Sequence, residues 1–310
     1  MTQLAFLFPG QGSQKAGMGR DWAEAFPESR RVFEEADDVL GFALSRLCWE
    51  GPEAELTLTA NLQPALVATS VAMLRAVETT GARPAAVAGH SLGEYSALVA
   101  AGTLELADAL RLTRRRGELM QQAVPVGEGA MAAILALDDA AVGALVAEAA
   151  LGEVLAIANW NAPGQVVVAG HRGAVERAVE LARERGGKPR LLPVSAPFHC
   201  PLMRPAREGL EPLLRETAFR DPAVPVVTNV DARPAASGAA ARDALVRQVD
   251  SPVRWVESVG WLADEAGVTA FVEVGPGSVL LNTVKRIRPE AGRIALGGPN
   301  ELMNLGRGGQ

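Results

Sequence analysis

The segment of this sequence best suited to chemistry is residues 89–93, which read Gly-His-Ser-Leu-Gly. A Gly-x-Ser-x-Gly motif between a strand and a helix is typical of a nucleophile elbow, a sharp turn that exposes the serine at the carboxyl edge of a sheet. Residues 84–88 form a short apolar run typical of a buried strand, and residues 96–101 favour a helix. We therefore predict that Ser91 is a nucleophile beside the positive end of that helix.

A serine hydroxyl needs a base within hydrogen-bond reach, and the chain has three histidines. His90 precedes the serine in the turn, where successive side chains diverge, and His171 follows a predicted strand, where a surface position is expected. His199 lies in a loop at a predicted domain junction, where ligand sites concentrate. We therefore favour His199 as the base. Cys200 could instead be a nucleophile, but it lacks a turn of its own, and a buried position is expected.

Four arginines follow one another along a helix predicted over residues 104–122. The buried stripe of this helix consists of Leu106, Leu110, Thr113, Gly117 and Met120. On the same helical wheel Arg111 and Arg115 point outward, whereas Arg114 and Arg116 flank the stripe. A run of arginines usually indicates a solvated face, but these two flanking side chains are able to reach inward.

A glycine-rich turn at residues 9–14 follows the first apolar segment and suggests a phosphate loop. The match fails, because Lys15 stands where a dinucleotide fingerprint needs glycine, and no Gly-Lys-Ser/Thr ends the turn. A turn of this kind after a strand is well suited to offering a backbone N–H to a ligand.

The composition argues against nucleic-acid and membrane partners. The 310 residues are 48% hydrophobic and 21% charged with a net charge of −6, and no dense basic stripe is present. Residues 1–9 have no basic segment, and their apolar run is too short for a signal peptide or a membrane span, so a first core strand is expected. Cys48 and Cys200 are far apart and form no CxxC pair, which fits neither a disulfide framework nor a metal site. They fit a reducing cytoplasm.

The order of the predicted elements indicates an α/β fold, with an α/β-hydrolase-like main domain on a parallel sheet and an inserted ferredoxin-like α+β subdomain. The main domain is expected to take residues 1–126 and 196–310, and the subdomain residues 127–195. In the main domain, Pro64 is expected to open a helix that runs to residue 77. A glycine-rich tail over residues 306–310 is expected to fray.

The subdomain prediction depends on six segments in the order βαββαβ. They are a strand at 131–137, a helix at 138–150, strands at 154–158 and 165–169, a helix at 173–185 and a strand at 190–194. A turn that contains Asn161, Pro163 and Gly164 is expected between the two middle strands.

Seven ordered motifs make the chain resemble the malonyl-CoA:acyl carrier protein transacylases from about residue 4 to residue 285. They are residues 8–13, 89–95, 116–117 with 120–121, 161–165, 197–199, 228–231 and 273–277. The resemblance implies that Ser91 is the acylated nucleophile and His199 its base. It implies that Gln248 orients the histidine through an amide carbonyl, from its side chain or main chain, in place of the usual carboxylate.

The resemblance also implies how the substrate is held. The backbone N–H groups of Gln11 and Leu92 would bind the oxyanion, and Arg116 would bind the free carboxylate of the malonyl group through two parallel hydrogen bonds. Phe198 resembles the residue of malonyl-selecting acyltransferases whose bulk would crowd an α-methyl branch. Arg116 is one of the two arginines that the helical wheel allows to reach inward.

The implied reaction is a ping-pong transfer in fatty-acid biosynthesis, from malonyl-CoA to the phosphopantetheine thiol of acyl carrier protein, without a metal or a bound cofactor. Because the carriers of such systems are acidic, a basic rim is expected to help docking. The candidates for this rim are Arg185, Lys188, Arg190, Lys285, Arg286 and Arg288.

Three other functions remain open at this point. A serine hydrolase such as a thioesterase would use the same elbow and histidine but transfer the acyl group to water. A carrier-docking protein without catalysis is disfavoured, because candidates for nucleophile, base and carboxylate clamp are all present. A stand-alone acyltransferase of a polyketide pathway would have nearly the same sequence features.

Overall fold

The five-stranded sheet that carries the Ser91 turn is parallel throughout, in the order β7-β2-β1-β8-β9. The computed structural model describes residues 2–302 and 305. The strands are β1 (Leu4–Phe8), β2 (Ala86–Gly89), β7 (Val226–Val227), β8 (Ala270–Glu273) and β9 (Gly292–Ala295). The apolar runs predicted as the first strand and as the strand before Ser91 are β1 and β2, side by side near the centre of the sheet. The edge strand β9 has no predicted counterpart, because its sequence Gly-Arg-Ile-Ala forms no apolar run.

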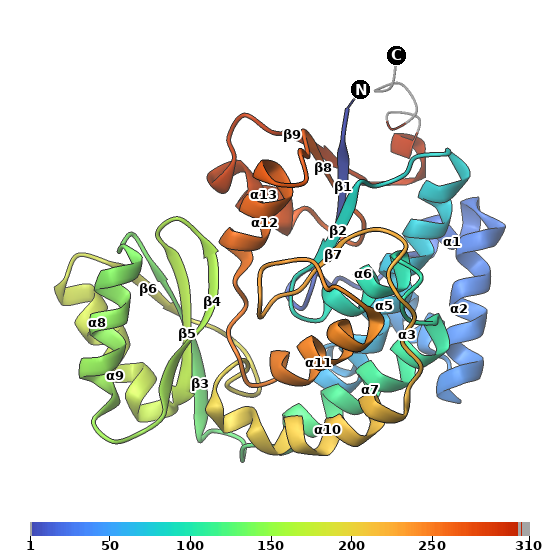
Figure 1. The fold of residues 1–310 in the computed structure, drawn as a ribbon. Coiled ribbons are helices and arrows are strands. Elements are labelled where there is room, and N and C mark those ends of the chain that lie inside the picture. Colours follow the sequence, from blue (N-terminus) through green and yellow to red (C-terminus); the bar gives the residue numbers. More distant parts are fainter. Residues whose placement is uncertain (1, 303–304, 306–310) are drawn as a thin grey trace.

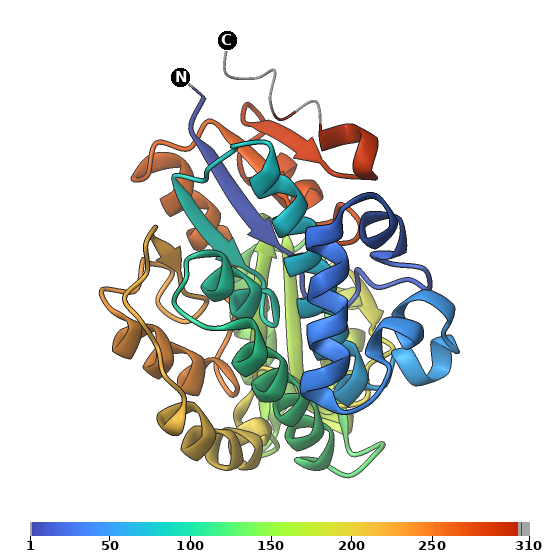
Figure 2. The ribbon, with the colours of Figure 1, turned by 90° about the vertical axis from the view of Figure 1, so that its right-hand side faces the viewer.

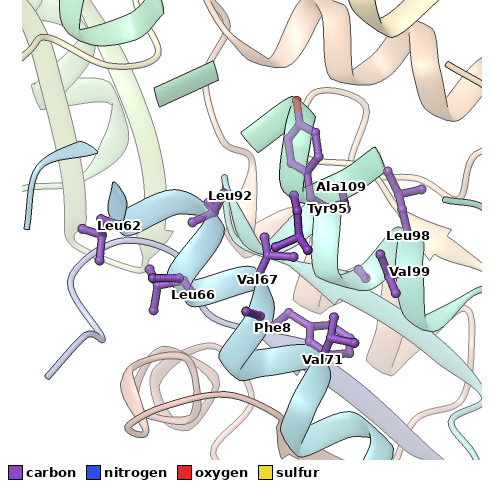
Figure 3. Packing of buried hydrophobic residues seen from close by; sticks show 14 of the residues in the cluster. Phe8, Leu62, Leu66, Val67, Val71, Leu92, Tyr95, Leu98, Val99 and Ala109 are labelled. Atoms are coloured by element: carbon purple, nitrogen blue, oxygen red, sulfur yellow. The ribbon is translucent and has the colours of Figure 1, made fainter. Parts of the chain in front are cut away.

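Helices cover both faces of this sheet (Figures 1 and 2). Phe6 and Phe8 of β1 pack in one core cluster with α5 (Thr59–Thr79), α6 (Gly93–Ala100) and α7 (Leu106–Gln122). Figure 3 shows side chains of α5 and α6 gathered with Phe8 in this layer. Ala5 and Leu7 face the other way and pack with α12 (Trp255–Asp264) and α13 (Val279–Ile287). The strand is therefore buried on both faces, as its uninterrupted apolar sequence predicts.

The remaining helices surround these two layers. They are α1 (Arg20–Ala25), α2 (Pro27–Leu40), α3 (Leu44–Glu50), α4 (Glu53–Leu56), α10 (Arg204–Glu216) and α11 (Gly238–Gln248), with short 3₁₀ turns η1 (Pro201–Met203) and η2 (Pro299–Leu302).

A second, antiparallel sheet lies beside the main body, at the left of Figure 1. Its elements are β3 (Gly129–Leu135), α8 (Asp139–Ala150), β4 (Leu155–Ala162), β5 (Gln165–His171), α9 (Arg172–Glu184) and β6 (Lys188–Leu191). The strand order β4-β5-β3-β6 is the ferredoxin-like arrangement. Val166 and Val168 pack under α8 and α9, whereas Val167 and Ala169 face the main core cluster. The predicted fold class is confirmed.

Helix α5 begins earlier than predicted. It starts at Thr59, so the prediction that Pro64 opens it is wrong, and Pro64 lies inside the helix. The helix is buried along most of its length, and this packing outweighs the backbone hydrogen bond that the proline cannot donate. Although α5 has 21 residues, no helix within residues 2–302 is both long and apolar enough to cross a membrane.

The strand boundaries in the second sheet also differ from prediction: β3 covers 129–135 rather than 131–137, and β4 and β5 end at 162 and 171 rather than at 158 and 169. Asn161 belongs to strand β4 rather than to the turn after it, because β4 continues through register shifts that interrupt its apolar pattern. The last strand, β6, begins at Lys188, two residues before the predicted start, although most of its side chains are exposed. The glycine-rich tail at 306–310 lies outside the described residues.

Candidate active site

The turn that carries Ser91 connects β2 to α6 and is closely packed on both sides. Ser91 has a left-handed backbone with φ of 52°, which non-glycine residues rarely adopt and which nucleophile elbows use. A Cβ atom on Gly89 would overlap the carbonyl of Gly93, and one on Gly93 would overlap the carbonyl oxygen of Phe8. Only glycine fits at these two positions, so the predicted strand, sharp turn and helix are confirmed.

His199 lies directly against the serine. The distance from Ser91 Oγ to His199 Nε2 is 2.6 Å, and the histidine is 4% exposed. On the other side of the ring, Nδ1 lies 3.0 Å from the main-chain oxygen of Gln248 and 3.1 Å from that of Ser251. Carbonyl oxygens only accept, so Nδ1 carries the proton and Nε2 is left free to accept the serine proton.

The loop that supplies these two carbonyls is attached to the second sheet. Trp160 N–H donates to the Val253 oxygen at 3.0 Å, and Val253 N–H donates to the Ala158 oxygen at 2.8 Å. Strand β4 therefore pairs with the chain two residues after Ser251 and fixes the position of this loop against the histidine.

The surroundings of His199 disfavour its protonated form. Burial is the main cause, followed by the nearby Arg116 charge and by His90, and together they lower the pKa of His199 to about 3. The imidazole is therefore neutral and able to accept a proton throughout the neutral pH range.

Arg116 reaches the same point from helix α7. It is 1% exposed, and its Nη2 lies 3.3 Å from Ser91 Oγ and 3.0 Å from Gln248 Oε1. Its Nη1 donates to Gln63 Oε1 at 2.9 Å, while its Nε has no hydrogen-bond partner in the part of the chain that the structure describes. None of the ion pairs among the described residues includes Arg116. A buried guanidinium that forms no ion pair and lies next to a nucleophile is suited to bind an anionic substrate group.

The other arginines of α7 follow the helical wheel. Arg111 and Arg115 are exposed, as predicted, and the half-buried Arg114 bonds to Asn61 and Glu118. Gly117 explains how Arg116 comes so close to the core: a Cβ there would lie 2.5 Å from the Thr59 oxygen at the start of α5.

The glycine-rich turn after β1 packs against the Ser91 turn. A Cβ on Gly10 would lie 2.5 Å from the His90 oxygen, so the two turns touch through their backbones. The backbone N–H groups of Gln11 and Leu92 have no acceptor within residues 2–302. Phe198 is 8% exposed beside His199 and belongs to the same core cluster as Leu92.

Residues 5–295 match the acyl transferase domain family. This chain belongs to the acyl transferase family. The malonyl CoA-acyl carrier protein transacylase of Escherichia coli K12 is 50% identical over 304 residues, which cover 97% of this chain and 98% of the relative. The solved acyl carrier protein S-malonyltransferase of Vibrio cholerae has a TM-score of 0.95 at 46% identity and covers 98% of this chain and 100% of that one. A malonyl-transacylase solved in complex with a type II PKS acyl-carrier protein also has a TM-score of 0.95 at 46% identity, with coverage of 98% and 99%.

The Ser91 turn of this acyltransferase is supported by Asn229, to which the sequence analysis assigned no role. Asn229 Oδ1 accepts a hydrogen bond from Ser91 N–H at 2.6 Å, and its Nδ2 donates to the Gly89 oxygen at 2.7 Å. Gln63 is a second residue without a predicted role, and it supports Arg116 instead: it accepts from Arg116 Nη1 and donates to Gln11 Oε1 at 3.3 Å. Both lie far from Ser91 in the chain, and only the motif at 228–231 signalled one of them.

The remaining histidines and Cys200 have other partners. His90 Nε2 lies 2.8 Å from Asn161 Oδ1 of β4, which links the two sheets. His171 is half-buried at the end of β5, and its Nδ1 accepts from Val154 N–H at 2.9 Å. Cys200 is fully buried, as expected, and burial raises the pKa of its thiol to about 12.

Proposed function

We propose that this acyltransferase moves the malonyl group from malonyl-CoA to the phosphopantetheine thiol of acyl carrier protein in fatty-acid biosynthesis, through a malonyl ester on Ser91. The observation that carries the proposal is the buried Arg116 guanidinium, which lies 3.3 Å from the Ser91 hydroxyl and forms no ion pair with any described residue. A substrate with a free carboxylate at the far end of its acyl group satisfies that charge. The similarity to near full-length malonyl transacylases supports the same substrate.

In the first half-reaction, His199 Nε2 takes the Ser91 proton as Oγ attacks the thioester carbonyl. The free N–H groups of Gln11 and Leu92 hold the negative oxygen that forms, and the collapse of the intermediate releases CoA, whose sulfur receives the proton from His199. In the second half-reaction, His199 takes the proton of the carrier thiol, the sulfur attacks the malonyl ester, the bond from the acyl carbon to Ser91 Oγ breaks, and His199 returns the proton to Oγ. These steps call for no metal or bound cofactor.

Two further residues have proposed roles at this site. The main-chain oxygen of Gln248, together with that of Ser251, fixes the tautomer of His199, and the Gln248 side chain binds Arg116. Phe198, which is buried beside His199, crowds an α-methyl branch and so favours malonyl over methylmalonyl groups. We also propose that residues 127–195 form an inserted unit between the two parts of the main domain, 1–126 and 196–310.

Two features disfavour a serine hydrolase. The groups that accept from His199 Nδ1 are neutral carbonyls, which stabilise an imidazolium less than the carboxylate of a hydrolase triad does. Arg116 occupies the acyl side of the serine with a charge that a lipid acyl chain would leave unpaired. We assign the enzyme to the cytoplasm, since Cys48 and Cys200 are free, buried thiols.

The acidic carrier is proposed to dock on exposed basic residues. Of the six candidates, Arg185, Arg286 and Arg288 are engaged with other groups of the chain. Lys188, Arg190 and Lys285 are exposed, and within the described residues none of the three forms an ion pair. These three are therefore the residues available to a carrier.

Intact-protein mass spectrometry tests the proposal. After mixing with malonyl-CoA, the protein should gain one malonyl group, Ser91→Ala should gain none, and added carrier protein with its phosphopantetheine arm should remove it. Continuous release of CoA without a carrier would support the hydrolase, and no adduct from any acyl-CoA would refute the catalytic assignment. Parallel transfer to a fatty-acid carrier and a polyketide carrier distinguishes the two pathways, and faster transfer to the fatty-acid carrier is expected.

A further inference from the structure

A buried carboxylate that the mechanism does not use lies beneath the Ser91 turn. Glu94, in the first turn of α6, is 0% exposed. Its Oε2 accepts hydrogen bonds from Asn229 N–H at 2.9 Å and from Gln248 Nε2 at 2.8 Å. Its Oε1 has no partner in the described part of the chain. Burying a carboxyl group is unfavourable unless the group is hydrogen-bonded. The two groups that donate to Glu94 therefore show what keeps it in this position.

The two donors belong to the two halves of the site. Asn229 holds the backbone of the Ser91 turn through its side chain. Gln248 holds the carboxylate-binding half, because its Oε1 accepts from Arg116 and its Nε2 also donates to the main-chain oxygen of Ser91. One oxygen of Glu94 therefore joins the nucleophile turn to the group that contacts Arg116.

The chemistry of the two side chains fixes which way the Gln248 amide faces. An amide has a donor end and an acceptor end, whereas Glu94 Oε2, which also receives the Asn229 N–H, acts as an acceptor only. Glu94, together with the main-chain oxygen of Ser91, therefore selects the orientation in which Gln248 Nε2 points to these two acceptors and Oε1 points to the guanidinium of Arg116. In the opposite orientation, the Gln248 NH₂ group would face the donors of Arg116, and its oxygen would face the oxygen of Glu94.

We propose that Glu94 is a positioning residue that acts through Gln248: by accepting from Gln248 Nε2, it aims Gln248 Oε1 at Arg116 and holds the guanidinium where the substrate carboxylate binds. This inference rests on the role proposed above for Arg116. It predicts that loss of the acceptor lowers the preference for malonyl over acetyl groups, beyond any general loss of activity.

Two variants of similar length separate the acceptor from the rest of the side chain. Glu94→Gln keeps an oxygen for both donors, and Glu94→Met removes it. The readout is the ratio of kcat/KM for Ser91 acylation by malonyl-CoA to that by acetyl-CoA. The ratio should fall about 10-fold in E94M and stay within about threefold of wild type in E94Q. Ser96→Ala is the matched control, because it removes a buried α6 oxygen without a partner and should leave the ratio unchanged.

A variant of the donor, Gln248, removes the same hydrogen bond and keeps the test decisive if E94M fails to fold. Gln248→Met retains the main-chain oxygen that faces His199 but lacks the amide. It should lower the ratio as E94M does, and the double variant should lower it no further, because both changes break one link. Thermal unfolding of each variant shows which of them are folded.

Arg116→Ala, measured in parallel, separates the two proposals. If R116A loses the malonyl preference while E94M and Q248M keep it, Glu94 does not position the guanidinium and the inference is overturned. If E94Q falls as far as E94M, the acceptor oxygen is not what matters, and the inference is also overturned. If R116A itself keeps the preference, the role of Arg116 fails and this inference fails with it.

Discussion

Replacing Arg116 by alanine should convert a malonyl-selective enzyme into one that hardly distinguishes malonyl from acetyl groups. The guanidinium is 1% exposed and 3.3 Å from the Ser91 hydroxyl, so a substrate carboxylate bound to it is shielded from water. Removing one partner of a buried, hydrogen-bonded charge pair destabilises a complex by about 2 to 5 kcal/mol. At about 1.4 kcal/mol for each factor of ten, kcat/KM for malonyl-CoA should fall by about 30-fold to about 4,000-fold.

Part of this loss has nothing to do with the substrate. Arg116 also donates to Gln63 and Gln248, and these oxygens lose a partner in the variant. Acetyl-CoA corrects for that contribution, because it places no carboxylate near the guanidinium but is attacked by the same serine. The ratio of the two kcat/KM values, rather than the malonyl value alone, therefore measures the carboxylate contact.

The assay is rapid-quench acylation of the enzyme followed by intact-protein mass spectrometry. Arg116→Lys should fall between wild type and R116A, since lysine keeps the charge but lacks the planar fork for a carboxylate. Arg114→Ala is the matched control, because Arg114 lies on the same helix and bonds to Asn61 and Glu118. The reasoning is refuted if R116A loses the same factor with both acyl-CoAs.

Three more perturbations follow from the geometry. Since the pKa of His199 is lowered to about 3, the base is neutral at pH 5 and kcat/KM should hold there, whereas a histidine with an ordinary pKa would lose about 30-fold. Burial raises the pKa of Glu94 to about 7, so the pH–rate profile is measured in Glu94→Gln as well as in wild type, and a half-point near 6.5 in both contradicts this. Asn229→Ala should slow acylation by about 10-fold, because Ser91 N–H loses its acceptor and the Gly89 oxygen loses its donor; a wild-type single-turnover rate in the variant contradicts it. Gly117→Ala should lower the free energy of unfolding by about 1 to 3 kcal/mol, through the contact with the Thr59 oxygen. Gly143→Ala is the control and should not lower the free energy of unfolding, because the added atom meets nothing within 4 Å. Urea unfolding measures both variants, and equal stabilities contradict the prediction.

Local patterns were enough to predict the Ser91 turn and the ferredoxin-like unit. The glycines at 89 and 93 can be replaced by no other residue, so the local sequence alone is enough to predict the turn. Arg116 was also within reach, because the phase of the α7 stripe placed it at the edge of the buried face. Strand and helix periods in the inserted unit gave its element order, and only the ends of its strands were misplaced.

Contacts between distant segments could not be predicted in the same way. The acceptors for His199 Nδ1 include the Ser251 carbonyl, and a main-chain oxygen has no residue type to search for. Asn229 lies 138 positions from Ser91, to which it binds, and an isolated asparagine is a weak signal. The early start of α5 escaped because Pro64 suggests a helix end, whereas burial on all sides allows the proline inside.

Because main-chain oxygens hold His199, the loop at 248–252 should respond differently to a substitution than to a change in its length. Every amino acid carries a carbonyl, so no point substitution at Gln248 or Ser251 deletes the groups that hold the ring. An insertion or deletion between them would move both oxygens relative to the ring, and pairing of Val253 with β4 would prevent the loop from sliding to compensate. In sequence drift or in engineering, position 251 should therefore accept new side chains far more readily than residues 249–252 accept a new length.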